Sequence, residues 1–131
     1  MNGNKILLDT NIVVYILSWN PDYIAKISEK EIFVSFITEL EVLSYNFETK
    51  QDEQTATSFF EEVYIAHMDN SIKNLVIALK RTYKIKLPDC IILATSLAYS
   101  IDLVTNDLDL MNIYNRALGD SEILALYNTT K

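Results

Sequence analysis

The stretch Ile6-Leu7-Leu8-Asp9-Thr10-Asn11 decides the fold of this 131-residue chain. A short apolar run that ends in three polar residues predicts a buried strand whose carboxyl end carries polar side chains. The next run of bulky and branched residues, Ile32–Phe36, predicts a second strand. Because helical patterns separate the two runs, we expect parallel strands that are joined by helices.

The same alternation continues outward from these two strands through the rest of the chain. Further strands are predicted at residues 63–66, 103–105 and 123–127. Helices are predicted at residues 12–18, 22–30, 39–47, 51–62, 71–84, 88–99 and 108–114. Thr38 is the expected N-cap of the third helix, and Asn70 or Ser71 that of the fifth. The fold class is therefore α/β: residues 1–131 form a single domain with helices on both faces of a mostly parallel sheet of about four to five strands.

The composition excludes several classes of protein. Half of the residues are hydrophobic, which is incompatible with wholesale disorder, and Cys90 is the single cysteine, so no intrachain disulfide can form. The longest apolar run, Ile12–Leu17, is far shorter than the roughly 20 residues that cross a bilayer. One His and two Gly leave no basis for a nucleophile elbow or a glycine-rich phosphate loop. We therefore expect a cytoplasmic protein that does not enter a membrane.

Four acidic residues differ from the other acids because each lies inside or beside an apolar segment. They are Asp9, Glu41, Asp89 and Asp107. Ligand sites in parallel sheets form at the carboxyl ends of strands, where Asp9 and Asp107 are predicted to lie. Two carboxylates roughly 4 Å apart repel each other by about 4 kcal/mol at an effective dielectric of about 20, so a cluster needs protons or cations. Oxygen ligands without Cys or His favour Mg²⁺ or Mn²⁺.

Each of these acids also has an ordinary structural interpretation. Asp9 and Asp89 fit helix caps, Glu41 fits a solvent-facing position, and Asp107 fits an Asn-Asp turn. The net charge of −7 argues against a protein that coats nucleic acid through bulk charge. It leaves open an enzyme that acts on nucleic acid through bound cations, because a carboxylate site counts as negative until its metal arrives.

Taken together, these segments resemble a PIN domain, specifically the short VapC-type ribonuclease toxins of bacterial toxin–antitoxin systems. The resemblance rests on LLDTN (residues 7–11), SFITELE (35–41), KIKLPDCIILAT (84–95) and LVTND (103–107), which occur in the family order. It spans residues 5–127. The resemblance implies that Asp9, Glu41, Asp89 and Asp107 are the catalytic residues and bind the metal. The family's Ser/Thr-x-x-Glu pattern selects Glu41 through Thr38, although Glu39 and Asp109 lie close to the assigned positions.

The resemblance also assigns supporting residues and partners. The family has polar residues that orient the carboxylates without binding the metal themselves, and these correspond to Thr10, Asn11 and Thr105. The implied activity is Mg²⁺- or Mn²⁺-dependent cleavage of RNA phosphodiester bonds, and the implied partners are an RNA substrate, a cognate antitoxin protein and a second copy in a homodimer. The apolar faces of the early helices are available for dimerisation.

Two other classes of protein share some of these features. A catalytically inactive PIN-like module that binds RNA or protein would keep the fold, although it has no need to hold four acids together. A phosphate-handling protein of the receiver type also gathers acids at strand ends. That type requires an Asp directly after the third strand, where this chain has His67.

Four of the eleven basic residues fall within seven positions, just before Asp89. They are Lys80, Arg81, Lys84 and Lys86. One interpretation is an RNA-binding edge beside the acidic site, formed by Arg81, Lys84 and Lys86. The other is an ordinary solvated helix end, whose cations complement the helix dipole.

Overall fold

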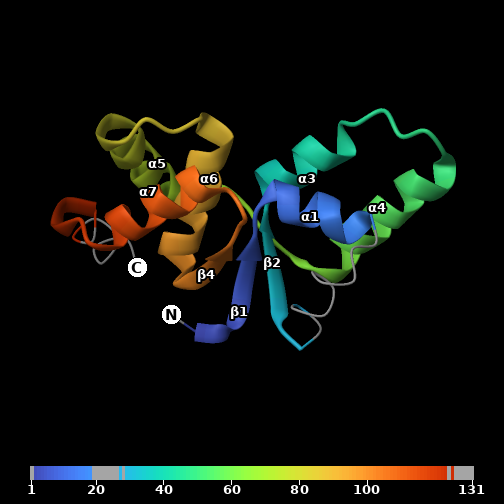
Figure 1. Ribbon diagram of the computed structural model, residues 1–131, viewed down its shortest axis with the longest axis horizontal. Coiled ribbons are helices and arrows are strands. Elements are labelled where there is room, and N and C mark those ends of the chain that lie inside the picture. Colours follow the sequence, from blue (N-terminus) through green and yellow to red (C-terminus); the bar gives the residue numbers. More distant parts are fainter. Residues whose placement is uncertain (1, 19–26, 28, 124, 126–131) are drawn as a thin grey trace.

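The computed structural model describes residues 2–18, 27, 29–123 and 125, and within them it has one parallel four-stranded sheet (Figure 1). The strands are β1 (Asn2–Leu8), β2 (Glu31–Ser35), β3 (Tyr64–Ala66) and β4 (Ile101–Val104), in the order β3-β2-β1-β4. The helices are α1 (Thr10–Leu17), α3 (Phe36–Leu43), α4 (Lys50–Glu62), α5 (Asn70–Thr82), α6 (Leu87–Tyr99) and α7 (Leu108–Leu118). The predicted α/β class and parallel sheet are confirmed.

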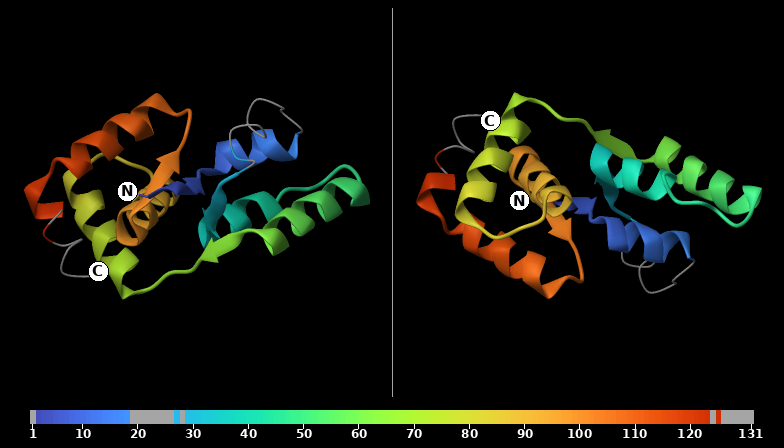
Figure 2. Two further views of the ribbon diagram at one scale, coloured as in Figure 1. Left: turned by 90° about the horizontal axis from the view of Figure 1, so that it is seen from below. Right: turned by 90° about the horizontal axis from the view of Figure 1, so that it is seen from above.

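Helices cover both faces of the sheet, as the two views of Figure 2 show. One layer consists of α5, α6 and α7, and the other of α1, α3 and α4. Successive side chains of a strand point to opposite faces, so Leu7 is buried in the first core, whereas Ile6 and Leu8 are buried in the second. β1 thus supplies both cores, which explains why residues 6–8 are continuously apolar.

The register of the strands brings their carboxyl ends to one edge of the sheet. Leu8, the last residue of β1, pairs with Val34 of β2 on one side and with Val104 of β4 on the other. The Asp9 amide then donates to the Val104 carbonyl over 3.1 Å. The residues that follow β1 and β4 therefore lie next to each other, although about a hundred positions separate them in the sequence.

Several helices begin earlier than the sequence pattern predicts, and in α3 and α5 the capping side chain lies one to three residues before the expected one. Ser35, not Thr38, caps α3, and Asp69, not Asn70 or Ser71, caps α5. Asp9 caps α1, so this helix includes Thr10. In each case the side-chain oxygen accepts a backbone N–H of the first turn that has no partner within the helix.

The predicted strand at residues 123–127 is wrong where the structure describes it. Ile123 and Ala125 are helical, and residues 124, 126 and 127 lie outside the described residues. The physical reason is Asp120, whose carboxylate accepts the amides of Glu122 and Ile123 and so starts a helical turn. Of the predicted helix at 22–30, only Ile27, which is helical, and residues 29–30, which are not, can be compared. In the described part of the chain, every helix is too short or too polar to span a bilayer.

Candidate functional site

Asp9 lies at the centre of the edge where the strands end. Its side chain is only 4% exposed, and Oδ1 accepts the Ile12 amide of α1 at 3.1 Å. The other oxygen, Oδ2, accepts a hydrogen bond from the Thr105 hydroxyl, which follows β4. The capping interpretation of Asp9 is therefore correct, and the same carboxylate is also fixed by a residue from the neighbouring strand end.

Asp107 is held by the same threonine. The Thr105 hydroxyl accepts the Asp107 amide at 3.0 Å while it donates to Asp9. Asp107 Oδ1 in turn accepts the amides of Asp109 and Leu110, so Asp107 caps α7. One hydroxyl thus connects the Asp9 carboxylate to the backbone of Asp107, whose own carboxylate is held by the start of α7.

Glu41 is connected to α1 by hydrogen bonds that involve two threonine hydroxyls. The Thr10 hydroxyl donates to Glu41 Oε1 at 2.8 Å, and Thr38 Oγ1 lies 3.1 Å from Thr10 Oγ1. A hydroxyl has a single proton, so Thr10, which uses its proton on Glu41, must accept from Thr38. Thr38 is completely buried. The sequence predicted Thr38 only as a helix cap; its spacing of three residues from Glu41 was the signal for this second role.

Asp89 lies in the first turn of α6, where Lys86 rather than Asp89 is the N-cap. Burial raises the pKa of Asp89 above its ordinary value, and the negative charges of Asp107, Asp9 and Glu41 raise it further. Lys86 acts in the opposite direction. The four predicted carboxylates come from four different segments of the chain, and the other three lie close enough to Asp89 for their charges to act on it.

The four acids fit the chemistry of a divalent cation site, although they do not form a finished one. Within the described residues, no three Asp, Glu, His or Cys side chains are placed so that together they could hold a metal ion. The donors are all oxygen atoms, as Mg²⁺ and Mn²⁺ prefer, and the surplus of negative charge adds to burial in raising the pKa of Asp89. A cation would remove that surplus.

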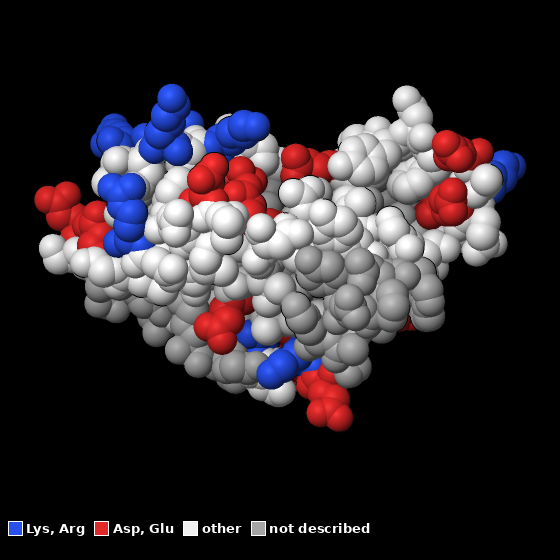
Figure 3. Space-filling view, in the orientation of Figure 1, with Lys and Arg blue, Asp and Glu red and all other residues white. Residues whose placement is uncertain are grey.

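A groove of about 220 Å³ runs beside Asp89 and Asp107. Lys84 and Lys86 line its rim together with Asp109. Figure 3 shows the wider pattern: Lys and Arg side chains gather over the connection between α5 and α6, and acidic side chains lie directly next to them. Positive and negative side chains therefore meet along one groove, as expected for a surface that binds both cations and phosphate groups.

The remaining predicted site residues differ in whether they contact the carboxylates or line the groove. Thr10 and Thr105 contact the carboxylates, as described above. Asn11 is exposed at the second position of α1, and Arg81 is exposed in the last turn of α5 and does not line the groove. Glu41, rather than Glu39, accepts from Thr10 and acts on the pKa of Asp89.

Comparison with solved structures gives a consistent set of neighbours. A toxin–antitoxin complex from Klebsiella pneumoniae is 29% identical, with a TM-score of 0.69, and the alignment covers 78% of this chain and 86% of that one. VapBC-1 from nontypeable Haemophilus influenzae is 23% identical, with a TM-score of 0.70 and coverage of 86% and 93%. VapBC2 from Rickettsia felis, bound to a DNA fragment from its promoter, is 20% identical, with a TM-score of 0.72 and coverage of 83% and 92%. The last two likenesses concern the fold alone.

Comparison by sequence gives the family. No curated protein matches the chain. The model of the PIN domain matches residues 6–116, a range that contains the end of β1, all of β4, the four carboxylates and the basic segment beside them. Because this match covers most of the sequence, the chain belongs to the PIN domain family.

Proposed function

We propose that this protein is a metal-dependent endoribonuclease that acts as the toxin of a toxin–antitoxin pair in the cytoplasm. The observation that carries the proposal is the electrostatic coupling of Asp89 to Asp9, Glu41 and Asp107. Four acids from distant segments meet at one edge of a sheet in a PIN domain, and their repulsion destabilises the fold. Such a cluster is expected where a bound cation offsets that cost.

Each residue has a specific role in the proposed reaction. Asp9, Glu41 and Asp89 would hold Mg²⁺ or Mn²⁺, and Asp107 would complete the site directly or through water. When bound, the ion lowers the pKa of a coordinated water and offsets the charge that develops on the phosphate. Thr105 keeps Asp9 and Asp107 at a fixed separation, and Thr10, backed by Thr38, holds Glu41 in place. Asn11 is proposed as a further supporting residue.

The RNA would approach over the basic side of the groove. Lys84 and Lys86 are exposed at its rim and would contact phosphates, with Arg81 contacting the strand farther from the acids. Water, rather than the ribose 2′-hydroxyl, would attack the phosphorus. The products would therefore carry a 5′-phosphate and a 3′-hydroxyl.

The proposed antitoxin partner is inferred from the similar solved structures rather than from the geometry of the acidic site. The structures that resemble this chain include toxin–antitoxin complexes, and the first of them is 29% identical. We therefore propose a cognate antitoxin protein as the inhibitor. A homodimer, which the family resemblance implies, is proposed as the assembly. Size-exclusion chromatography with light scattering of the purified chain tests the dimer.

Cleavage of bacterial RNA tests the catalytic proposal. The wild-type protein should cleave RNA with Mg²⁺ or Mn²⁺ and stop when a chelator is added. Asp89→Asn should lower the rate by about 100-fold or more, since a lost metal ligand removes the activated water. Glu39→Gln, a change of the same kind two positions from Glu41, is the matched control and should keep most of the activity. Cyclic-phosphate ends formed without metal would contradict the mechanism.

The alternative is a PIN-like module that binds RNA or protein without cleaving it. The distinguishing result is RNA binding by the wild-type protein with no cleavage under any divalent cation. The charge cluster disfavours this alternative, because a binding module gains nothing from keeping Asp89 among three other carboxylates.

A further inference from the structure

The segment between α5 and α6 carries the two lysines that line the groove, and it has a regular alternation. Tyr83 and Ile85 are each 8% exposed, whereas Lys84 and Lys86 are exposed. A period of two is that of an extended chain, whose successive side chains point to opposite sides. The two buried residues therefore act as anchors, and the two lysines face outward, where they line the groove together with part of Ile85.

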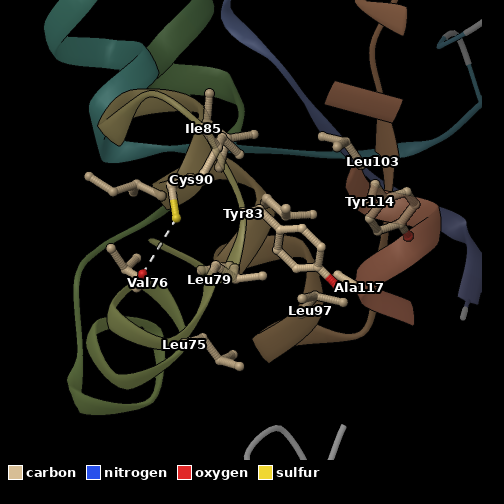
Figure 4. Close-up of a cluster of buried hydrophobic side chains, with 14 of the residues drawn as sticks. Leu75, Val76, Leu79, Tyr83, Ile85, Cys90, Leu97, Leu103, Tyr114 and Ala117 are labelled. Carbon is tan, nitrogen blue, oxygen red and sulfur yellow. Dashed lines mark hydrogen bonds between the residues drawn. The ribbon is translucent and has the colours of Figure 1, made fainter. Parts of the chain in front are cut away.

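The first anchor, Tyr83, is fixed by α7 and the residues after it. Its hydroxyl donates to Asp120 Oδ2 at 3.1 Å, and the Arg116 guanidinium lies 5.1 Å from the centre of its ring. Figure 4 shows the ring extending from the end of α5 toward Ala117 of α7. Because Asp107 caps α7, this contact connects the start of the segment to the helix that one of the four carboxylates caps.

The second anchor, Ile85, is held through its backbone. Its side chain enters the core beside Cys90 (Figure 4), and its carbonyl accepts a hydrogen bond of 2.7 Å from Lys80 Nζ. Lys80 lies in the last turn of α5, so it reaches across the end of its own helix to the extended segment. A charged donor on a carbonyl gives a stronger hydrogen bond than a neutral one.

We propose that Lys80 is a positioning residue, which binds the Ile85 carbonyl and thereby holds Lys84 and Lys86 in the orientation that binds RNA phosphates. The inference rests on the proposed function and assigns Lys80 a role that differs from that of the other basic residues nearby. The ammonium group of Lys80 donates to the Ile85 carbonyl, and Lys80 does not line the groove, so this role requires no contact of its own with RNA. Its effect on RNA passes through the segment that it holds.

The hold on the segment is tested without RNA, by limited trypsin digestion of the folded protein. Trypsin cleaves after Lys and Arg only where the chain can open locally, so cleavage after Lys84 and Lys86 reports the opening of this segment. Lys80→Met, which keeps the length but removes the donor, should accelerate cleavage at these two bonds about fivefold or more. Lys80→Arg, which keeps a donor and a charge, should restore protection. Equal cleavage rates in all three proteins would overturn the inference.

The effect on RNA is tested by binding of a fluorescent single-stranded RNA in the presence of a chelator, where no cleavage occurs. Lys80→Met should weaken binding roughly fivefold. The same change in a Lys84→Met/Lys86→Met background should have no further effect, because the two lysines that Lys80 positions are then absent. Lys80→Arg should bind nearly as well as the wild type. A phosphate ligand would instead give additive losses and overturn the inference.

The two measurements also separate this inference from the proposed function. Failure of the wild-type protein to bind RNA would overturn the proposed function and the RNA-binding part of the inference together. Normal RNA binding by Lys80→Met, with increased cleavage after Lys84 and Lys86, would leave the proposed function intact and reduce Lys80 to a purely structural residue, which overturns the inference alone.

Discussion

Thr105 is the residue on which the geometry of the site depends most directly. Its hydroxyl donates to Asp9 and accepts the Asp107 amide, so one side chain connects the ends of β1 and β4 to the start of α7. The sequence pointed to Thr105 only through its place beside Asp107 in the LVTND motif. Its contact with Asp9, which lies 96 positions earlier, results from parallel pairing of β1 with β4. No local pattern in the sequence contains that information.

We therefore expect Thr105→Val to impair catalysis with little change in the fold. Valine has the same shape but cannot hydrogen-bond, so Oδ2 of Asp9 loses its partner while Oδ1 keeps the Ile12 amide, and the metal is bound less tightly. The concentration of Mg²⁺ that gives half-maximal RNA cleavage should rise by about 10- to 100-fold, the usual cost of losing a residue that orients a metal ligand. The measurement is a Mg²⁺ titration of the cleavage rate.

Thr57→Val is the matched control for this experiment. The Thr57 hydroxyl also makes one hydrogen bond, to the Glu53 carbonyl within α4, and the side chain is exposed and belongs to a helix that carries no site residue. It should leave the Mg²⁺ dependence unchanged. An unchanged Mg²⁺ dependence in Thr105→Val as well would contradict the positioning role of Thr105.

Cys90, directly after Asp89, is a core residue in spite of its place beside the site. It is completely buried, its thiol donates to the Val76 carbonyl, and burial raises its pKa to about 11 (Figure 4). The sequence already favoured this interpretation, because Cys90 begins an apolar run.

We expect the thiol of Cys90 to be unreactive in the native protein. The reactive species is the thiolate, which is rare at pH 8 for a group with this pKa, and the reagent has no access to the side chain. Iodoacetamide at pH 8 should alkylate Cys90 only after denaturation, as mass spectrometry of the intact chain measures. Rapid alkylation of the folded protein would show that the start of α6 opens readily.

At the scale of helices and strands, most of the described elements were predictable from the sequence pattern, and their ends were not. α6 was expected at residues 88–99 and is Leu87–Tyr99, because eight consecutive buried residues and a Pro in its first turn leave few alternatives. The ends depend on which of several neighbouring polar side chains reaches a free amide. The side chains of Asp69, Asn70 and Ser71 are all able to accept such an amide; Asn70 or Ser71 was expected from the sequence, and the structure selects Asp69.

Asp120 shows how one cap can reverse the prediction for a whole element. Ile123 and its neighbours have the apolar pattern of a strand, but the Asp120 carboxylate binds the amides of Glu122 and Ile123 and also the Tyr83 hydroxyl. The hydrogen bond from the Ile123 amide lowers the pKa of Asp120 most, and those from Tyr83 and the Glu122 amide add to the effect.

The stabilising effect of Asp120 is therefore expected to disappear in acid. A carboxyl group whose pKa is lower in the folded state stabilises the fold above its unfolded-state pKa of about 3.9, and the contribution is lost as the pH falls through the folded-state pKa. Asp120→Asn should be less stable than the wild type between pH 5 and 8, by an amount that does not vary with pH in that range. The difference should shrink below about pH 4.

Urea unfolding of both proteins across this pH range measures the difference. Glu122→Gln changes an exposed acid two positions away and is the matched control, with little effect at any pH. A difference between Asp120→Asn and the wild type that persisted undiminished at pH 3 would contradict the assigned role of the charge.

At the scale of the whole molecule, the parallel sheet explains why acids that are dispersed in the sequence meet in space. Each strand ends at the same edge, and each following helix begins there, so Asp9 and Asp107 as caps and Asp89 in a first turn lie near the positive ends of three helices. The sequence was sufficient to predict that these acids lie at strand ends and helix starts. It was not sufficient to predict how their carboxylates are oriented. Their arrangement depends on hydroxyl contacts such as Thr10 to Glu41.

The clustering predicts that Asp89→Asn changes stability in opposite directions without and with divalent cations. Without divalent cations, Asp89→Asn should raise the melting temperature, because it removes a charge that Asp107, Asp9 and Glu41 repel. With Mg²⁺ at about 100 times its dissociation constant, the wild-type protein should gain about 2.7 kcal/mol and melt several degrees higher, because the ion binds only the folded chain. Asp89→Asn should gain much less, so the order of the two melting temperatures should reverse or the gap between them should close.

Differential scanning calorimetry of both proteins, with and without Mg²⁺ at constant ionic strength, measures the two effects. Glu39→Gln removes a charge that does not act on Asp89 and should follow the wild type in both conditions, which separates the cluster from the general excess of negative charge. The same gain from Mg²⁺ in all three proteins would mean that the ion binds elsewhere on this acidic surface. In that case the acids would be together for a reason other than metal binding, and the nuclease mechanism would lose its basis.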